Sequence, residues 1–180
     1  MNRPTDLPQA TAISAALTLL QGYPTDLIEA VRRLIEQGRL AEVLHQRHPE
    51  PHAVRSDPAL FDYVNELRQR HLRHAPPLSR VCYDPSLRRV HQALGTHTAV
   101  SRVQGGRLKA KREIRVASLF RDAPADLLRM IVVHELAHLK EPDHDRAFYA
   151  LCHHIEPDYA RLEFDTRLFL IQLQLQGKPT

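Results

Sequence analysis

The 180-residue sequence has no tryptophan, only two cysteines and only 6% aromatic residues. Cys82 and Cys152 are too few for a disulfide framework and lack the spacing of a metal-binding CxxC pair. No apolar run approaches the roughly 20 residues that a membrane-spanning helix needs, and no signal-peptide pattern is present. We therefore expect a cytoplasmic protein without membrane contact, whose cysteines are buried thiols.

Charge is unevenly placed along the chain. The formal net charge is +4. The segment from Arg102 to Arg115 contains six basic residues and one acidic residue, a net +5, so the rest of the chain is close to neutral. This basic segment could hold the phosphates of a nucleotide or a nucleic acid, or it could simply be a solvated face.

The pattern of apolar residues changes near Ala75-Pro76-Pro77. Before it, helical spacing predominates, as in the stripe formed by Leu27, Ile28, Val31, Leu34 and Ile35. After it, strand candidates at 79–83, 97–103 and 113–117 are followed by three helices that reach residue 176, with Gly105-Gly106 as a candidate hairpin turn. We expect an α+β fold, with a helical N-terminal region at 1–77 and a second domain at 78–176 built on a small antiparallel sheet.

The first of the three late helices is apolar on nearly all sides, which is typical of a buried helix. Asp122 is a candidate cap for it, and Pro142 is expected to end it. It nevertheless contains His134, Glu135 and His138, in the pattern HExxH. Residues four apart share a helix face, so His134 and His138 can reach one metal ion, while Glu135 can accept a proton from a metal-bound water.

A catalytic zinc ion needs a third protein ligand and an open position for water. His144 is our prediction for this ligand, because imidazole suits zinc and a proline between His138 and His144 lets the chain turn back. Asp143 and Asp145 are alternatives, although either could cap the next helix. Further downstream, the alternatives are Glu156 and Glu163.

Residues Ile131 to Tyr159, with the sequence IVVHELAHLKEPDHDRAFYALCHHIEPDY, resemble the YgjP-like family of zinc metallopeptidases. The resemblance rests on the HELAHL core, on a histidine six residues later, on Phe148-Tyr149 and on Pro157-Asp158-Tyr159. It implies a zincin-like core related to the WLM-type and SprT-like proteases. Carried over residue by residue, it implies that His134, His138 and His144 are ligands of a zinc ion (Zn²⁺) and that Glu135 is the catalytic acid/base.

Three functions remain open from the sequence. The first choice is a zinc-dependent metallopeptidase, in which Glu135 activates the metal-bound water for attack on a peptide bond of a peptide or protein substrate. The alternative is a nucleotide pyrophosphatase that cleaves a phosphoanhydride with the same water. The second alternative is a DNA-associated protease, in which the basic segment contacts the nucleic-acid backbone.

Overall fold

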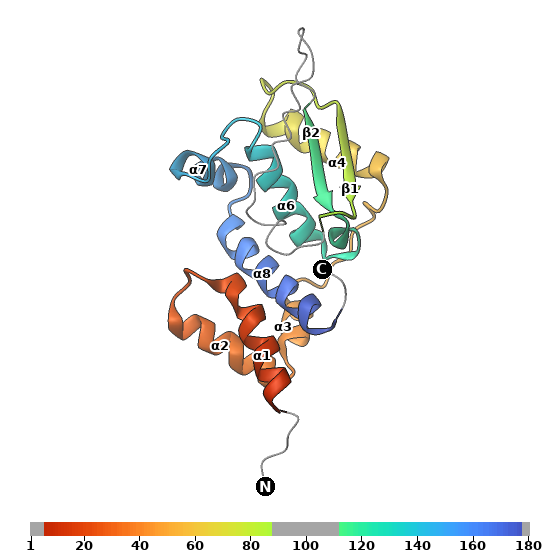
Figure 1. Cartoon of the computed structure of the whole chain (residues 1–180). Coiled ribbons are helices and arrows are strands. Elements are labelled where there is room, and N and C mark those ends of the chain that lie inside the picture. The colour runs from red at the N-terminus through yellow and green to blue at the C-terminus, as the bar shows by residue number, and fades with distance from the viewer. Residues whose placement is uncertain (1–5, 88–111, 178–180) are drawn as a thin grey trace. The chain divides into compact units, whose positions relative to one another are not determined.

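The computed structural model describes residues 6–87 and 112–177 (Figure 1). Contacts along the chain define two compact units: residues 1–49 together with 164–180, and residues 50–163. The boundary expected between residues 77 and 78 therefore lies inside the second unit. The physical reason is that helix α4 (Asp57–His71) packs against strand β1 (Arg80–Asp84), which ties residues on both sides of the two prolines together.

The first unit is helical. It contains α1 (Asp6–Leu17), the short 3-10 helix η1 (Thr18–Leu20), α2 (Thr25–Glu36), α3 (Leu40–Arg47) and the later part of α8 (Tyr159–Leu175). The helical spacing read from Leu27 to Ile35 is confirmed by α2. Gly38 follows that helix with a φ of +68°, a left-handed conformation that glycine adopts without steric cost.

A buried polar cluster joins α3 to α8 within the first unit. Asp165 is fully buried, and its two carboxylate oxygens accept hydrogen bonds from Arg47 at 2.7 Å and His48 at 2.9 Å. Arg167 also donates to the backbone oxygen of Leu19 at 3.0 Å. Since a buried charge is costly unless it is paired, these contacts allow a carboxylate to sit in this helical core.

The second unit contains the sheet. Strand β1 pairs with β2 (Glu113–Ala117) in the register Arg80↔Glu113 through Asp84↔Ala117. The α+β class is confirmed, but these two strands run parallel, and the expected antiparallel arrangement is wrong for them. Parallel neighbours need a crossover of a dozen or more residues, which the 28 intervening residues can supply. The strand candidate at 97–103 and Gly105-Gly106 lie outside the described residues.

Helices cover this sheet. Helix α4 contacts β1, and α6 (Ala125–Ala137) contacts β2. Ser56 caps α4 by accepting a hydrogen bond from the backbone nitrogen of Ala59 at 3.3 Å. Asp122 does not cap α6 as expected, because it ends a separate 3-10 helix, η2 (Ser118–Asp122), and Pro124 occupies the cap position.

Two further helices follow α6 in the chain: α7 (Arg146–Ile155) and the beginning of α8. Across the described ranges, no helix combines the length and hydrophobicity needed to cross a membrane.

Candidate metal centre

Helix α6 carries two of the candidate ligands into the interior. Nine of its thirteen residues are buried, among them His134, which is 5% exposed. Asp126 lies in the first turn, where a negative charge interacts favourably with the helix dipole. His138 is the C-cap residue. The helix therefore ends before Pro142, the residue expected to end it, and the turn that follows is made of local backbone hydrogen bonds.

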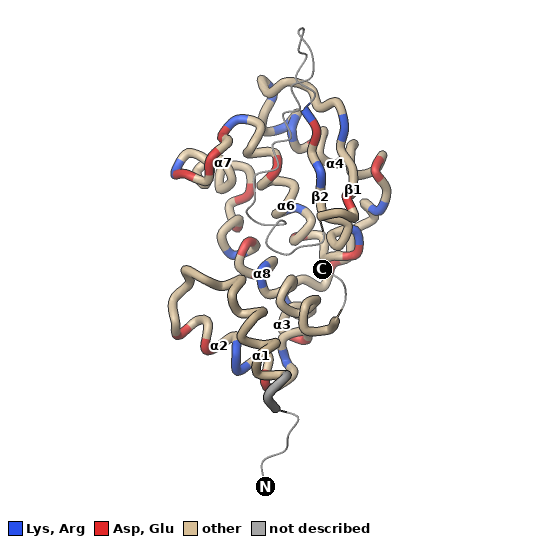
Figure 2. Tube along the Cα trace, in the orientation of Figure 1, with Lys and Arg blue, Asp and Glu red and all other residues tan. Residues whose placement is uncertain are grey.

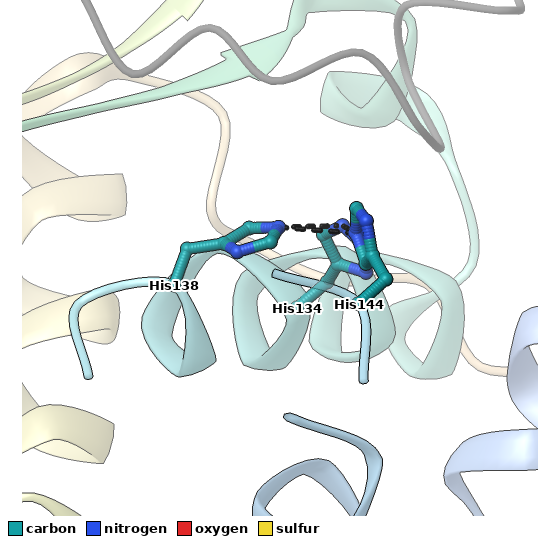
Figure 3. Close-up of side chains that lie close together, drawn as sticks. All are labelled: His134, His138 and His144. Atoms are coloured by element: carbon teal, nitrogen blue, oxygen red, sulfur yellow. Dashed lines mark hydrogen bonds between the residues drawn. The ribbon is translucent and has the colours of Figure 1, made fainter. Parts of the chain in front are cut away.

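The structure brings His134, His138 and His144 together (Figure 3). Their Nε2 atoms are separated by 3.3 Å between His134 and His138, and by 3.1 Å from each of these to His144. Within residues 6–87 and 112–177, no other group of three His, Cys, Asp or Glu side chains is close enough to share a metal ion. The fold therefore brings together the three histidines expected from their spacing, and their role as metal ligands stays a prediction.

The separations between these nitrogen atoms fit a metal ion. Zinc–nitrogen bonds of 2.0–2.1 Å in a tetrahedral arrangement place two ligand nitrogens about 3.3 Å apart. The outer ring nitrogens support the same conclusion. Because the backbone oxygen of Glu141 can only accept, the Nδ1–H of His138 donates to it at 3.1 Å, and a neutral ring then has its lone pair on Nε2. The donor set consequently fits a cation that prefers imidazole.

A buried aromatic ring supports the three imidazoles. Phe148 lies in α7, is fully buried, and has its ring centroid 4.6–5.0 Å from those of His134, His138 and His144. Asp145 caps α7 and accepts hydrogen bonds from the backbone nitrogens of Ala147 and Phe148. Asp145, the residue directly after His144, thus fixes the start of the helix that carries Phe148.

The alternative third ligands lie outside the histidine group. Asp145 is engaged as a helix cap, and Asp143 is exposed. Glu156 forms an ion pair with Arg129 of α6. Glu163 acts electrostatically on Tyr159 and Cys152, and it does not join the histidines.

Glu135 follows His134 directly in α6. Burial raises the pKa of its carboxyl group from 4.5 to about 7. A general base is most effective when its pKa is near the working pH, so this environment suits proton transfer. A cation held at the histidines would favour the ionised carboxylate and lower this pKa.

Tyr159 also lies at the candidate metal centre, although the spacing of residues in the sequence indicated no role for it. Its hydroxyl lies 2.8 Å from Nδ1 of His134, and its side chain is fully buried at the start of α8. Only the resemblance included it, as the end of Pro157-Asp158-Tyr159. Its distance of 25 positions from His134 left no periodic signal that could have linked the two.

In the described part of the basic segment, Arg115 is paired with acidic residues. Arg115 pairs with Asp84 at 3.1 Å and with Glu113 at 3.2 Å, and Arg80 pairs with Glu113 at 3.4 Å. Figure 2 shows both signs of charge on β1 and β2. Residues 102–111, with most of the basic residues, lie outside the described ranges, so phosphate binding by this segment stays a prediction.

Comparison with known proteins identifies two similarities. A family model described as "YgjP-like, metallopeptidase domain" matches residues 86–165. The chain is 58% identical, over 159 residues, to a protein of Escherichia coli (strain K12) named UTP pyrophosphatase; the match covers 88% of this chain and 95% of that protein. No solved structure matches the chain. His134, Glu135, His138 and His144 all lie inside the region that the family model matches.

Proposed function

This chain belongs to the YgjP-like family and is therefore a metal-dependent hydrolase, and from that premise we propose that its metal is zinc and its substrate a nucleoside triphosphate. The observation that carries the choice of substrate is the 58% identity, across nearly the whole chain, to a protein named UTP pyrophosphatase. This reverses the order favoured by the sequence motif alone, which placed a peptidase first.

His134, His138 and His144 would hold the zinc ion. Three imidazoles are a common ligand set for catalytic zinc, and structural zinc sites instead use four ligands that are usually rich in thiolates. Neither cysteine belongs to the histidine group. When bound, zinc would act as a Lewis acid: it would lower the pKa of a water molecule and make that water a nucleophile near neutral pH.

Glu135 would act as the general base and then as the general acid. It would take one proton from the attacking water while the water oxygen forms a bond to phosphorus. The bridging phosphorus–oxygen bond then breaks, and Glu135 returns the proton to the departing oxygen of pyrophosphate. Such a transfer is typically worth ~10²- to 10⁴-fold in rate.

A metallopeptidase is the second candidate, because the matching family model is described as a metallopeptidase domain. The residues would have the same roles, with the water oxygen attacking a peptide carbonyl and Glu135 protonating the departing amine. The third possibility from the sequence, a protease that acts on DNA-bound proteins, depends on the basic segment and stays a prediction. It would require DNA binding that weakens steeply with salt.

Hydrolysis assays on the zinc-loaded full chain distinguish these candidates. We expect release of pyrophosphate from UTP and no cleavage of casein, an unfolded protein. Glu135→Gln should lower the rate by at least 10²-fold and keep one zinc ion per chain. Glu66→Gln is the matched control, since Glu66 forms an exposed ion pair with Arg70 in the same compact unit.

Each outcome has a defined meaning. Cleavage of casein alone, lost in Glu135→Gln, would replace the pyrophosphatase with the peptidase. Full activity of Glu135→Gln on either substrate would contradict the proposed role of this residue.

A further inference from the structure

Tyr159 lies beside the histidine cluster and contacts the ring nitrogen of His134 that does not face the other two histidines. His134 faces the other two histidines with Nε2 and faces the Tyr159 hydroxyl with Nδ1, at 2.8 Å. Both side chains are buried, with exposed fractions of 5% for His134 and 0% for Tyr159. The hydroxyl therefore influences which nitrogen of this imidazole carries the proton.

The direction of this hydrogen bond decides whether His134 can bind a cation. If Nδ1–H donates to the tyrosine oxygen, the neutral ring has its lone pair on Nε2, facing the cluster. If the hydroxyl donates instead, the proton of the ring moves to Nε2 and blocks coordination. The Cys152 thiol also interacts with the Tyr159 hydroxyl, and burial keeps this thiol neutral by raising its pKa to about 12. A tyrosine oxygen can accept a hydrogen bond while its own O–H points elsewhere, so Tyr159 can accept from the Nδ1–H of His134 at 2.8 Å.

The connection between α7 and α8 holds Tyr159 in place. Its backbone nitrogen donates to the backbone oxygen of Glu156 at 3.0 Å, and the Glu156 carboxylate pairs with Arg129 of α6. Helix α6 thus contacts this connection twice, through Arg129 and through His134. Tyr159 therefore lies at the start of α8, next to the helix that carries His134.

We propose that Tyr159 is a positioning residue that holds the His134 imidazole in the tautomer and orientation needed to bind the metal. This inference rests on the proposed zinc site and adds a residue outside the ligand set. Outer partners of metal-bound histidines fix the ring and its tautomer, and their loss typically weakens metal binding 10- to 100-fold.

Zinc affinity of the full chain, measured by competition with a chromophoric chelator, tests the proposal. Tyr159→Phe removes only the hydroxyl, and we expect zinc binding to weaken about 10- to 100-fold. Tyr83→Phe is the matched control, because Tyr83 is also buried and its hydroxyl donates to the backbone oxygen of Val54 at 2.6 Å. Tyr83 lies on β1, and the loss of its hydroxyl should change zinc affinity by less than about twofold.

A spectroscopic measurement separates positioning from general destabilisation. In ¹⁵N-resolved spectra of the zinc-loaded protein, the Nδ1 proton of His134 should be hydrogen-bonded in the unmodified protein and in Tyr83→Phe, and should lose this signature in Tyr159→Phe. The melting temperature of each metal-free variant serves as the control for folding.

The possible failures are distinguishable. If the unmodified chain binds no zinc, the proposed function fails. If it binds zinc and Tyr159→Phe binds equally well, or if both tyrosine variants weaken binding to the same extent, the role of Tyr159 is overturned while the zinc site stands.

Discussion

Each compact unit contains a buried histidine, and the two histidines have opposite kinds of partners. In the first unit, His48 is 3% exposed and contacts the Asp165 carboxylate, which Arg47 also contacts. In the second unit, His134 is 5% exposed and contacts two other imidazoles and a tyrosine hydroxyl. In the first cluster, Arg47 and His48 are hydrogen-bond donors and the Asp165 carboxylate accepts from both. In the second cluster, the Nε2 atoms of three imidazoles face one another, which is an arrangement that a bound cation would stabilise.

Removing one ligand should produce the largest difference between the two clusters. His138→Ala should reduce bound zinc from one ion per chain to nearly none, because two imidazoles alone rarely retain a catalytic metal. The metal-free variant should lose only about 1 kcal/mol of stability, since the His138 side chain is half-buried and one hydrogen bond contributes about that amount.

Metal analysis after dialysis and urea unfolding of the metal-free chain check both expectations. The control is His74→Ala, which removes an exposed histidine from the same unit. Retention of stoichiometric zinc by His138→Ala would show that the ligand set is wrong.

Removing the buried carboxylate of the first unit should lower the stability of the chain and leave its zinc affinity unchanged. Asp165→Ala removes the carboxylate that His48 and Arg47 share, and we expect a loss of about 3 kcal/mol in the free energy of unfolding. Zinc affinity should stay within about twofold, because the site lies in the other compact unit.

Asp122→Ala is the comparison variant, since Asp122 forms an exposed ion pair with Arg55. Exposed pairs are worth about 0–1 kcal/mol, so urea unfolding should separate the two variants clearly. Equal losses would argue that the Asp165 cluster contributes no more than a surface pair.

The smallest expected effect concerns a carboxylate at the end of β1. Hydrogen bonds from Ser86 hold the pKa of Asp84 below its ordinary value, with Arg115 contributing in the same direction. A lowered pKa in the folded chain adds stability above the unfolded value of about 3.9, and this stability is lost as the pH falls through the folded value.

Ser86→Ala removes the hydroxyl and should raise the pKa of Asp84 towards its ordinary value. We expect it to cost about 1 kcal/mol at pH 7 and to have a smaller effect at pH 3, as measured by urea unfolding at both values. An equal cost at both pH values would show that Ser86 does not act through the charge of Asp84.

The sequence predicted those parts of the fold that depend on local pattern. The apolar stripe around Val31 predicted α2, and the strand candidate at 113–117 predicted β2. It did not predict that β1 and β2 run parallel, because strand direction depends on the path of the chain between them. It also placed the domain boundary at the prolines near residue 77, whereas α4 packs with the strand beyond them.

For the site, the amino-acid sequence by itself singled out His134, Glu135, His138 and His144, and their chemical roles stay predictions. Helix geometry brings His134 and His138 to one face, and His144 follows only six residues later, so both are short-range properties of the sequence. Only the tertiary structure decided the groups that surround them. Tyr159 reaches His134 across 25 positions, and Phe148 packs against all three rings. Such contacts depend on how separate helices pack: the apolar pattern of a helix shows which face packs, but not which residue of another helix meets it.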